Sequence, residues 1–155
     1  MTILNESGFH NFNGILEPTT EQMEKIIEDN KTDGSVLFLY FAAYWAPPCI
    51  KFASKIDDMF KEIVKEIPKV NFYLMSLDKE KDKFLKFVGE MRNIAIDSNI
   101  FKSQMIQDMA EKFKVEGIPR LIVLINGEAD DNGYEDFMLK NNGVIKYYQD
   151  KLNVK

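Results

Sequence analysis

The sequence predicts a single α/β domain, a sandwich in which helices flank a mixed central sheet. The chain has 155 residues, which is the size of one domain. Hydrophobic residues make up 45% of it, enough to form a core and to argue against disorder. Three segments with the character of strands, at 36–42, 70–77 and 120–125, are separated by segments with helical periodicity, and the first is a continuous apolar run. This alternation predicts strands joined by crossover helices.

The N-terminal part predicts a short lead-in followed by a helix. Residues 1–18 are rich in Asn and Gly and are expected to be irregular or strand-like. Thr19 and Gln22 are spaced as a capping box, which predicts a helix over 21–30. The turn-forming residues at 31–34 end this helix.

The next three elements predict a βαβ unit. Run 36–42 has the length and side-chain types of a strand buried on both faces. A long amphipathic helix starts at Pro47 and Pro48, and Pro68 ends it. The strand at 70–77 follows, so the two strands are expected to be parallel and joined by a right-handed crossover.

The second half predicts two more helices and an antiparallel hairpin. Asp78 is expected to cap the third helix, and a fourth is expected over 101–113. After the strand at 120–125, the acidic segment 128–140 is expected to be a loop insertion. A turn signal then precedes 144–148, which we expect to be the last strand of the same sheet.

Composition excludes several classes of function. The chain carries 20 basic and 25 acidic residues, so its net charge of −5 argues against a nucleic-acid surface. No apolar stretch approaches the ~18 residues of a membrane span, and no secretory signal is visible. The single cysteine rules out an internal disulfide framework and a multi-cysteine zinc site. We therefore expect a cytoplasmic protein without a metal or a cofactor.

Unusual chemistry is concentrated where the first strand meets the long helix. The strand leads to Trp45, and Pro47 and Pro48 directly precede the only cysteine, Cys49. A helix N-terminus stabilises an anion such as a thiolate, and Ala46 occupies the first position here. Cys49 lies on the inward stripe of the helix, where burial raises the pKa of a thiol and weakens it as a nucleophile.

These segments resemble the tryparedoxin and nucleoredoxin branch of the thioredoxin superfamily. Segment 36–49 ends in Trp-Ala-Pro-Pro-Cys, where that branch carries Trp-Cys-Pro-Pro-Cys. Met-Ser-Leu-Asp at 75–78 is similar to the family strand that ends in Ser-Trp-Asp. Segment 113–119 is similar to the one that ends in the family's cis-proline. The resemblance covers about 36–125, more than half of the chain, and implies a thioredoxin-like three-layer sandwich.

The resemblance implies a thiol–disulfide oxidoreductase that reduces protein disulfides. The attacking cysteine of the family falls on Ala46 and the resolving cysteine on Cys49. A thiol such as trypanothione or glutathione, or a reductase, would supply the electrons. Tyr40 stands where many thioredoxins place a buried Asp, and this branch has Tyr too, so no carboxylate is expected to assist proton transfer.

The resemblance also implies a surface that binds disulfide-containing or extended protein substrates. Pro119 would be the cis-proline, and Ile118 would offer backbone hydrogen bonds to the substrate. Trp45, Pro47 and Pro48 would form the rest of this surface. The family's Trp and Pro after the third helix are absent from 93–97, so no preference for trypanothione is implied.

Ala46 separates two interpretations of the function. Without a cysteine at this position the chain cannot complete a dithiol–disulfide cycle. Ala46 is either an engineered inactivating substitution, which the otherwise intact site favours, or a natural loss of the nucleophile. In the second case the domain would be a redox-inactive module that binds extended protein segments. Monothiol chemistry at Cys49, such as glutathionylation, is the least favoured alternative.

We expect the other candidate residues to be ordinary surface residues. His10 is the only histidine and has no second ligand near it in the sequence. Asp57 with Asp58, and Asp130 with Asp131, are carboxylate pairs that we expect to be solvated.

Overall fold

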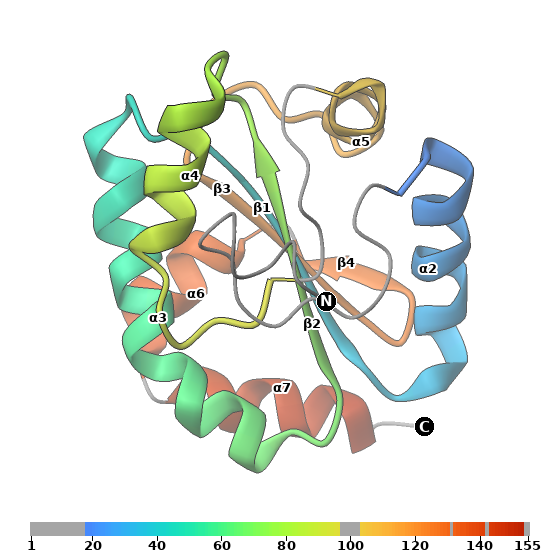
Figure 1. Cartoon of the computed structure of the whole chain (residues 1–155). Helices are drawn as coiled ribbons and strands as arrows, with labels where there is room; N and C mark the ends of the chain where they lie inside the picture. Colours follow the sequence, from blue (N-terminus) through green and yellow to red (C-terminus); the bar gives the residue numbers. More distant parts are fainter. Residues whose placement is uncertain (1–17, 97–102, 131, 142, 154–155) are drawn as a thin grey trace, which may run out of the picture.

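A four-stranded mixed sheet forms the centre of the molecule, with helices on both faces (Figure 1). The computed structural model describes residues 18–96, 103–130, 132–141 and 143–153. The strands lie in the order β2-β1-β3-β4. In chain order the elements are α2 (Thr20–Asp33), β1 (Val36–Ala42), α3 (Pro47–Glu66), β2 (Val70–Ser76), α4 (Lys81–Gly89), α5 (Gln104–Lys112), β3 (Arg120–Ile125), β4 (Glu128–Asp130), α6 (Gly133–Lys140) and α7 (Gly143–Asn153).

The central strand β1 divides the hydrophobic core in two. All seven of its residues are buried, and successive side chains point to opposite faces. Phe38 and Tyr40 belong to the core beneath α3, α6 and α7, whereas Leu39 and Phe41 belong to the core beneath α2 and α5. A strand covered on both faces needs apolar residues throughout, which explains its continuous apolar sequence.

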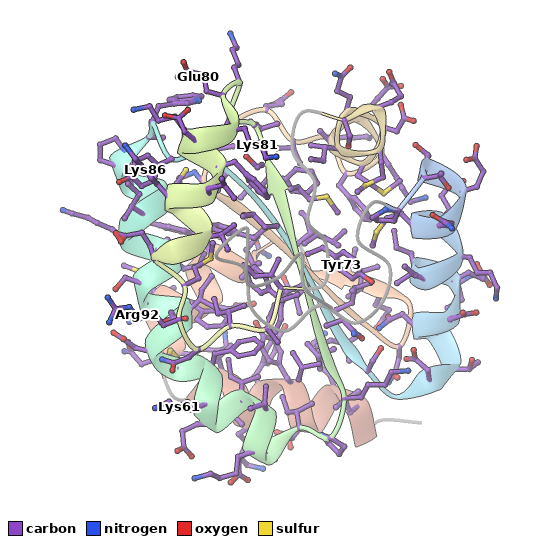
Figure 2. All side chains as sticks on the ribbon, viewed as in Figure 1. Lys61, Tyr73, Glu80, Lys81, Lys86 and Arg92 are labelled. Atoms are coloured by element: carbon purple, nitrogen blue, oxygen red, sulfur yellow. The ribbon has the colours of Figure 1, made fainter. Side chains whose placement is uncertain are left out.

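The helices divide between the same two faces (Figure 1). Helices α3, α4, α6 and α7 cover one face, and α2 and α5 cover the other. Figure 2 shows Tyr73 of β2 on the side of α2, and Lys61 and Lys86 on the outer surfaces of α3 and α4. The result is the three-layer α/β sandwich that the sequence predicts. Among the described residues, no helix combines the length and apolar composition needed to cross a membrane.

The pairing of the strands brings three segments to one edge of the sheet. β1 pairs with β2 in parallel, as predicted, and with β3 in the antiparallel sense. Phe41 therefore lies opposite both Met75 and Arg120. The segments that follow β1 and β2, and the segment that precedes β3, consequently meet at this edge.

The start of α2 confirms the predicted capping box. The Thr19 hydroxyl accepts a hydrogen bond from the Gln22 backbone N–H at 3.1 Å. The Gln22 side-chain oxygen accepts one from the Thr19 backbone N–H at 2.8 Å. The helix extends to Asp33, beyond the predicted end at residue 30.

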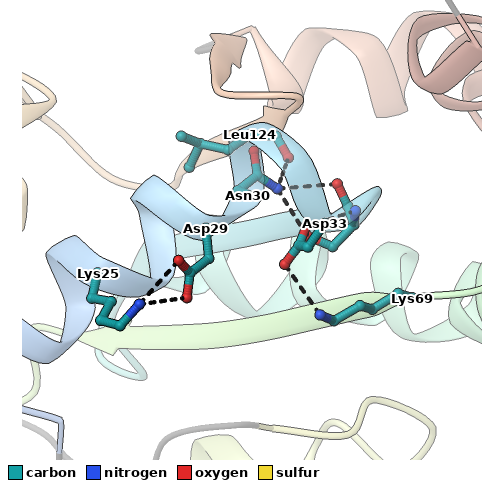
Figure 3. A network of polar contacts seen from close by, with 7 residues as sticks. Lys25, Asp29, Asn30, Asp33, Lys69 and Leu124 are labelled. Carbon is teal, nitrogen blue, oxygen red and sulfur yellow. Dashed lines mark hydrogen bonds and ion pairs between the residues drawn. The ribbon is translucent and has the colours of Figure 1, made fainter.

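A buried polar network fastens the other end of α2 (Figure 3). The Asn30 amide donates hydrogen bonds to the backbone oxygens of Ser35 and Leu124, at 3.0 and 3.2 Å. Its oxygen accepts one from the Gly127 N–H at 2.9 Å. Through these hydrogen bonds, the fully buried Asn30 joins α2 to the start of β1 and to the β3–β4 turn.

The C-terminal third differs from the prediction. Segment 144–148, expected as a strand, belongs to the helix α7, and segment 128–140, expected as a loop, contains β4 and α6. The hairpin partner of β3 is β4, reached through Asn126 and Gly127, whose φ angles are 54° and 83°. Val144 and Tyr148 are four residues apart and both fully buried, which suits one face of a helix.

Two acidic side chains also differ from the prediction. Asp78 does not cap the third helix, because α4 begins at Lys81 after Glu80. Asp57, expected in solvent, is buried and accepts hydrogen bonds from the backbone N–H groups of Asn93 and Ile94, at 2.7 and 3.1 Å. It thereby anchors the segment that follows α4 onto α3.

The remaining predicted boundaries need small changes. The fourth helix, expected over 101–113, is α5 and begins at Gln104, with the Ser103 hydroxyl as its cap. Residues 1–17 of the predicted lead-in, which includes His10, lie outside the described residues, as do residues 101–102 and Asp131.

Candidate functional site

The candidate site lies at the edge where the three segments meet. The Leu77 N–H donates a hydrogen bond to the Ala42 carbonyl oxygen at 2.9 Å, which fastens the end of β2 beside the end of β1. The Ile118–Pro119 peptide bond is cis, as the resemblance implies, and directly precedes β3. Loop 43–46 therefore lies at the same edge as Pro119.

Ala46 occupies the N-cap position of α3, one residue before the position predicted for it. It is half-buried and has an extended backbone conformation, with φ −107° and ψ 102°. Pro47 and Pro48 carry no N–H, and the Cys49 N–H donates to the Ala46 carbonyl oxygen at 2.8 Å. The start of α3 therefore acts on a side chain at position 46 through its dipole more than through free N–H groups.

Cys49 lies one turn inside α3 and is fully buried. Burial raises the pKa of its thiol, a hydrogen bond with the Ala43 backbone lowers it in part, and the negative charge of Asp78 raises it. The Tyr40 hydroxyl donates a hydrogen bond to the Cys49 carbonyl oxygen at 2.6 Å. The thiol is therefore neutral near pH 7, as its inward position predicts.

Asp78 is a part of the site that the sequence reasoning missed. Its carboxylate is fully buried at the end of β2 and accepts hydrogen bonds from the Tyr44 N–H at 2.8 Å and the Ser76 hydroxyl at 2.9 Å. It thus fixes the loop after β1 and acts electrostatically on the Cys49 thiol. A carboxylate does lie close to the thiol, at the end of β2 and not at the Tyr40 position. An acidic residue directly after a buried strand was the available signal.

The residues predicted to bind substrate lie around the same edge. Trp45 is 61% exposed, and Pro47 and Pro48 are exposed beside it in the chain. Ile118 and Pro119 are half-buried, and Ile118 packs against both cores. An exposed aromatic ring and a fixed backbone segment are suited to holding an extended polypeptide.

Helix α6 adds two clefts that the sequence did not predict. One, of about 260 Å³, lies between α3 and α6 and is lined by Pro47, Pro48, Lys51, Phe52, Lys55, Tyr134 and Met138. The other, of about 270 Å³, is lined by Pro119, Arg120, Asn132, Tyr134 and Glu135. Tyr134 is common to both, and its position depends on the packing of α6, for which the sequence carries no local signal. Within the described part of the chain, no three potential metal ligands cluster.

Comparisons with known proteins identify the family of this chain. Residues 34–129 match the family model described as thioredoxin-like. The chain is 30% identical over 91 residues to probable nucleoredoxin 1 of Arabidopsis thaliana, covering 59% of this chain and 15% of that protein. It is 29% identical over 93 residues to tryparedoxin of Trypanosoma brucei brucei, covering 59% of this chain and 61% of that protein. The chain thus spans a small part of the nucleoredoxin and somewhat under two thirds of the tryparedoxin.

Solved structures show the same fold. Tryparedoxin I from Leishmania major superimposes with a TM-score of 0.61 at 25% identity, over 71% of this chain and 76% of that one. Native tryparedoxin I from Crithidia fasciculata gives a TM-score of 0.64 at 22% identity, over 76% and 80% of the two chains. The family match spans more than half of the sequence and contains β1, β2, β3, the cis-proline and the Trp-Ala-Pro-Pro-Cys segment. The chain therefore belongs to the thioredoxin-like family, within its tryparedoxin and nucleoredoxin branch.

Proposed function

We propose that this domain is a thiol–disulfide oxidoreductase that reduces protein disulfides, with position 46 as the attacking position and Cys49 as the resolving one. One observation carries the proposal: the buried Cys49 lies one helical turn from the half-buried Ala46, at the edge formed by the exposed Trp45 and the cis Pro119. With alanine at position 46, the chain holds the resolving thiol without its partner.

The chemistry requires a thiolate at position 46. Its sulfur attacks one sulfur of the substrate disulfide, a mixed disulfide forms, and the other substrate sulfur leaves as a thiolate. The Cys49 thiolate then attacks the sulfur at position 46, a 46–49 disulfide forms, and the second substrate thiolate is released. The substrate gains two electrons, and a thiol donor later returns two electrons to the domain.

The dipole of α3 and the burial of Cys49 suit these two roles. The N-terminal end of a helix stabilises negative charge, so a cysteine at position 46 has a lowered pKa. The Cys49 thiol, whose pKa is raised chiefly by burial, stays protonated until the mixed disulfide has formed.

The variant Ala46→Cys tests the proposal. We expect it to accelerate the reduction of insulin by dithiothreitol, measured as the onset of turbidity, whereas the unmodified chain and Ala46→Ser stay at the uncatalysed rate. If folded Ala46→Cys protein forms the 46–49 disulfide and still leaves the insulin rate unchanged, the proposal is wrong.

The partners that fit this proposal are protein disulfides and a thiol electron donor. A structure of tryparedoxin II in complex with glutathionylspermidine, at 18% identity to this chain, supports a low-molecular-mass thiol as the class of donor. Oxidised Ala46→Cys protein offered glutathione, trypanothione or a thioredoxin-type reductase in parallel identifies the donor by which one regenerates the thiols. The single cysteine fits a reducing compartment such as the cytoplasm.

Ala46 itself favours a second candidate function, a redox-inactive module that binds extended protein segments. The exposed Trp45 and the cis Pro119 suit such binding without a thiol. The codon for residue 46 in the native gene separates the candidates: a cysteine codon supports the oxidoreductase, and an alanine codon supports the binding module.

A further inference from the structure

We infer that the cleft between α3 and α6 is a specificity subsite, which receives an apolar side chain of the partner polypeptide and, directly beside it, a carboxylate. The inference rests on the proposed function, because the polypeptide in question is the one that crosses the candidate site. It concerns α6, to which neither the motif nor the resemblance assigns a role.

The cleft is contiguous with the candidate site. Pro47 and Pro48, which follow the attacking position directly, form one of its walls. Helix α6 forms the opposite wall and is held tightly against β3: a Cβ atom at Gly133 would lie 2.6 Å from the Leu121 carbonyl oxygen. A polypeptide bound at position 46 therefore has a fixed apolar cleft next to it.

The walls of the cleft suit a single large apolar side chain. The rings of Phe52 and Tyr134 pack with their centroids 4.5 Å apart. Met138 lines the cleft and is 46% exposed, and methionine adapts its shape to varied partners. A volume of about 260 Å³ is smaller than a typical pocket for a drug-sized ligand, and it suits one side chain such as Leu or Phe.

The charges at the cleft select a carboxylate as the neighbouring group. Among the described residues, Lys51 and Lys55 are the only charged ones that line the cleft, although the chain as a whole carries a net charge of −5. Lys51 is exposed, and its ammonium group makes no hydrogen bond or ion pair with any residue that the structure describes. The Lys55 ammonium donates to the Asn141 side-chain oxygen at 2.7 Å, a neutral partner that leaves its charge uncompensated. An acidic segment is therefore attracted, and a basic one is repelled.

Titration of the ¹⁵N-labelled chain, followed by NMR, tests the inference directly. The probe is the acetylated, amidated peptide Gly-Ser-Leu-Glu-Glu-Gly, with Leu→Gly and Glu→Lys versions for comparison. We expect amide shifts at Lys51, Tyr134 and Met138, and a dissociation constant about fivefold larger for either altered peptide. Amide shifts confined to Trp45 and to the residues next to Pro119 would overturn the inference. Equal affinity for all three peptides would overturn it too.

Matched variants separate the cleft from its surroundings. We expect Met138→Glu to weaken binding of the acidic peptide about fivefold, whereas Leu139→Glu, at an 80% exposed neighbour outside the cleft, changes it less than about twofold. Lys51→Glu is expected to weaken binding similarly, with Lys61→Glu, in the C-terminal half of α3 (Figure 2), as its control. If the cleft variant and its control weaken peptide binding equally in either pair, the effect comes from the net charge of the protein and not from the cleft, and the inference is overturned.

The binding measurement is independent of the redox proposal, because it uses the chain without a thiol at position 46. Cleft binding together with an inactive Ala46→Cys variant would refute the oxidoreductase and keep the subsite in the peptide-binding alternative. An active Ala46→Cys variant that processes acidic and basic peptide disulfides at equal rates would refute the subsite alone.

Discussion

The environment of Cys49 determines how its thiol reacts. The side chain is fully buried, and burial together with the charge of Asp78 raises the pKa of the thiol. We expect native protein to react with Ellman's reagent about a hundredfold or more slowly than unfolded protein, because reaction requires local opening. Reduced native Ala46→Cys protein serves as the control and is expected to label quickly at its new cysteine. Rapid labelling of the unmodified native chain would contradict the burial of the Cys49 thiol and would favour monothiol chemistry at this residue.

Asp78 is a second residue whose role is electrostatic. We expect Asp78→Asn to lower the pKa of the Cys49 thiol, because the negative charge that raises it is removed. The Asn oxygen can still accept the hydrogen bond from the Tyr44 N–H, and its NH2 group can donate one to the Ser76 hydroxyl oxygen. The pKa is expected to stay above the ordinary value, since burial is the larger cause. The ¹³Cβ chemical shift of Cys49 against pH measures it. Asp82→Asn, at an exposed position of α4, is the control, and an equal shift there would refute the role of Asp78.

The junction of α2 with the sheet depends on one buried amide. Asn30 bonds to Ser35, to Leu124 and to Gly127, so its removal leaves buried backbone groups without partners. We expect Asn30→Ala to lower the free energy of unfolding by about 2–3 kcal/mol, measured by urea denaturation. Asp29→Ala on the same helix removes only an exposed ion pair with Lys25 and is expected to cost less than about 0.5 kcal/mol. Equal losses would show that the hydrogen bonds of Asn30, drawn in Figure 3 together with the control pair, do not stabilise the junction.

Elements with a strong local pattern were predictable from the sequence, and the others were not. The sequence of β1 is a continuous apolar run, and that of α3 has a regular apolar stripe that ends before Pro68. Both elements lie where they were expected. Segment 144–148 is rich in β-branched and aromatic residues, which favour a strand in isolation. In the structure Val144, Ile145 and Tyr148 form the buried face of α7, whereas Lys146 is exposed. β4 has only three residues, too few for a periodic signal.

The same distinction applies to the candidate site. The segment from Trp45 to Cys49 could be identified because a motif places its residues within one turn of a helix. Tyr134 reaches the site only through the packing of α6 on β3, which is a tertiary effect. The sequence places Asp78 at the end of a strand, but its burial beside Cys49 depends on the pairing of β1 with β2.

At the scale of the whole molecule, a cluster of acidic and aromatic side chains joins β4, α6 and α7. The Tyr147 hydroxyl donates to the Asp130 carboxylate at 3.1 Å, and Lys140 pairs with Asp136 at 3.1 Å. Asp136 is buried, and burial, a hydrogen bond with Asp130 and the charge of Asp130 raise its pKa to about 6. Burial opposes ionisation of Asp130 too, but hydrogen bonds, among them that of Asp136, hold its pKa below the ordinary value. Asp136 therefore carries the proton that the two carboxyl groups share.

This shared proton makes the stability of the fold depend on pH. Between the ordinary pKa of 3.8 and about 6, the folded protein keeps a proton on Asp136 that the unfolded chain releases, so this carboxyl contributes less stability as pH rises through that window. We expect Asp136→Asn, which resembles the protonated carboxyl, to gain stability relative to the unmodified chain as pH rises from 4 to 6.5, measured by urea denaturation. The difference between the two proteins cancels the contributions of carboxylates that do not contact Asp136, and the amide introduced at position 136 can still donate a hydrogen bond to Asp130. Glu135→Gln, at an exposed position of α6, is expected to show no such trend. A difference that runs the opposite way would mean that ionised Asp136 stabilises the fold through Lys140.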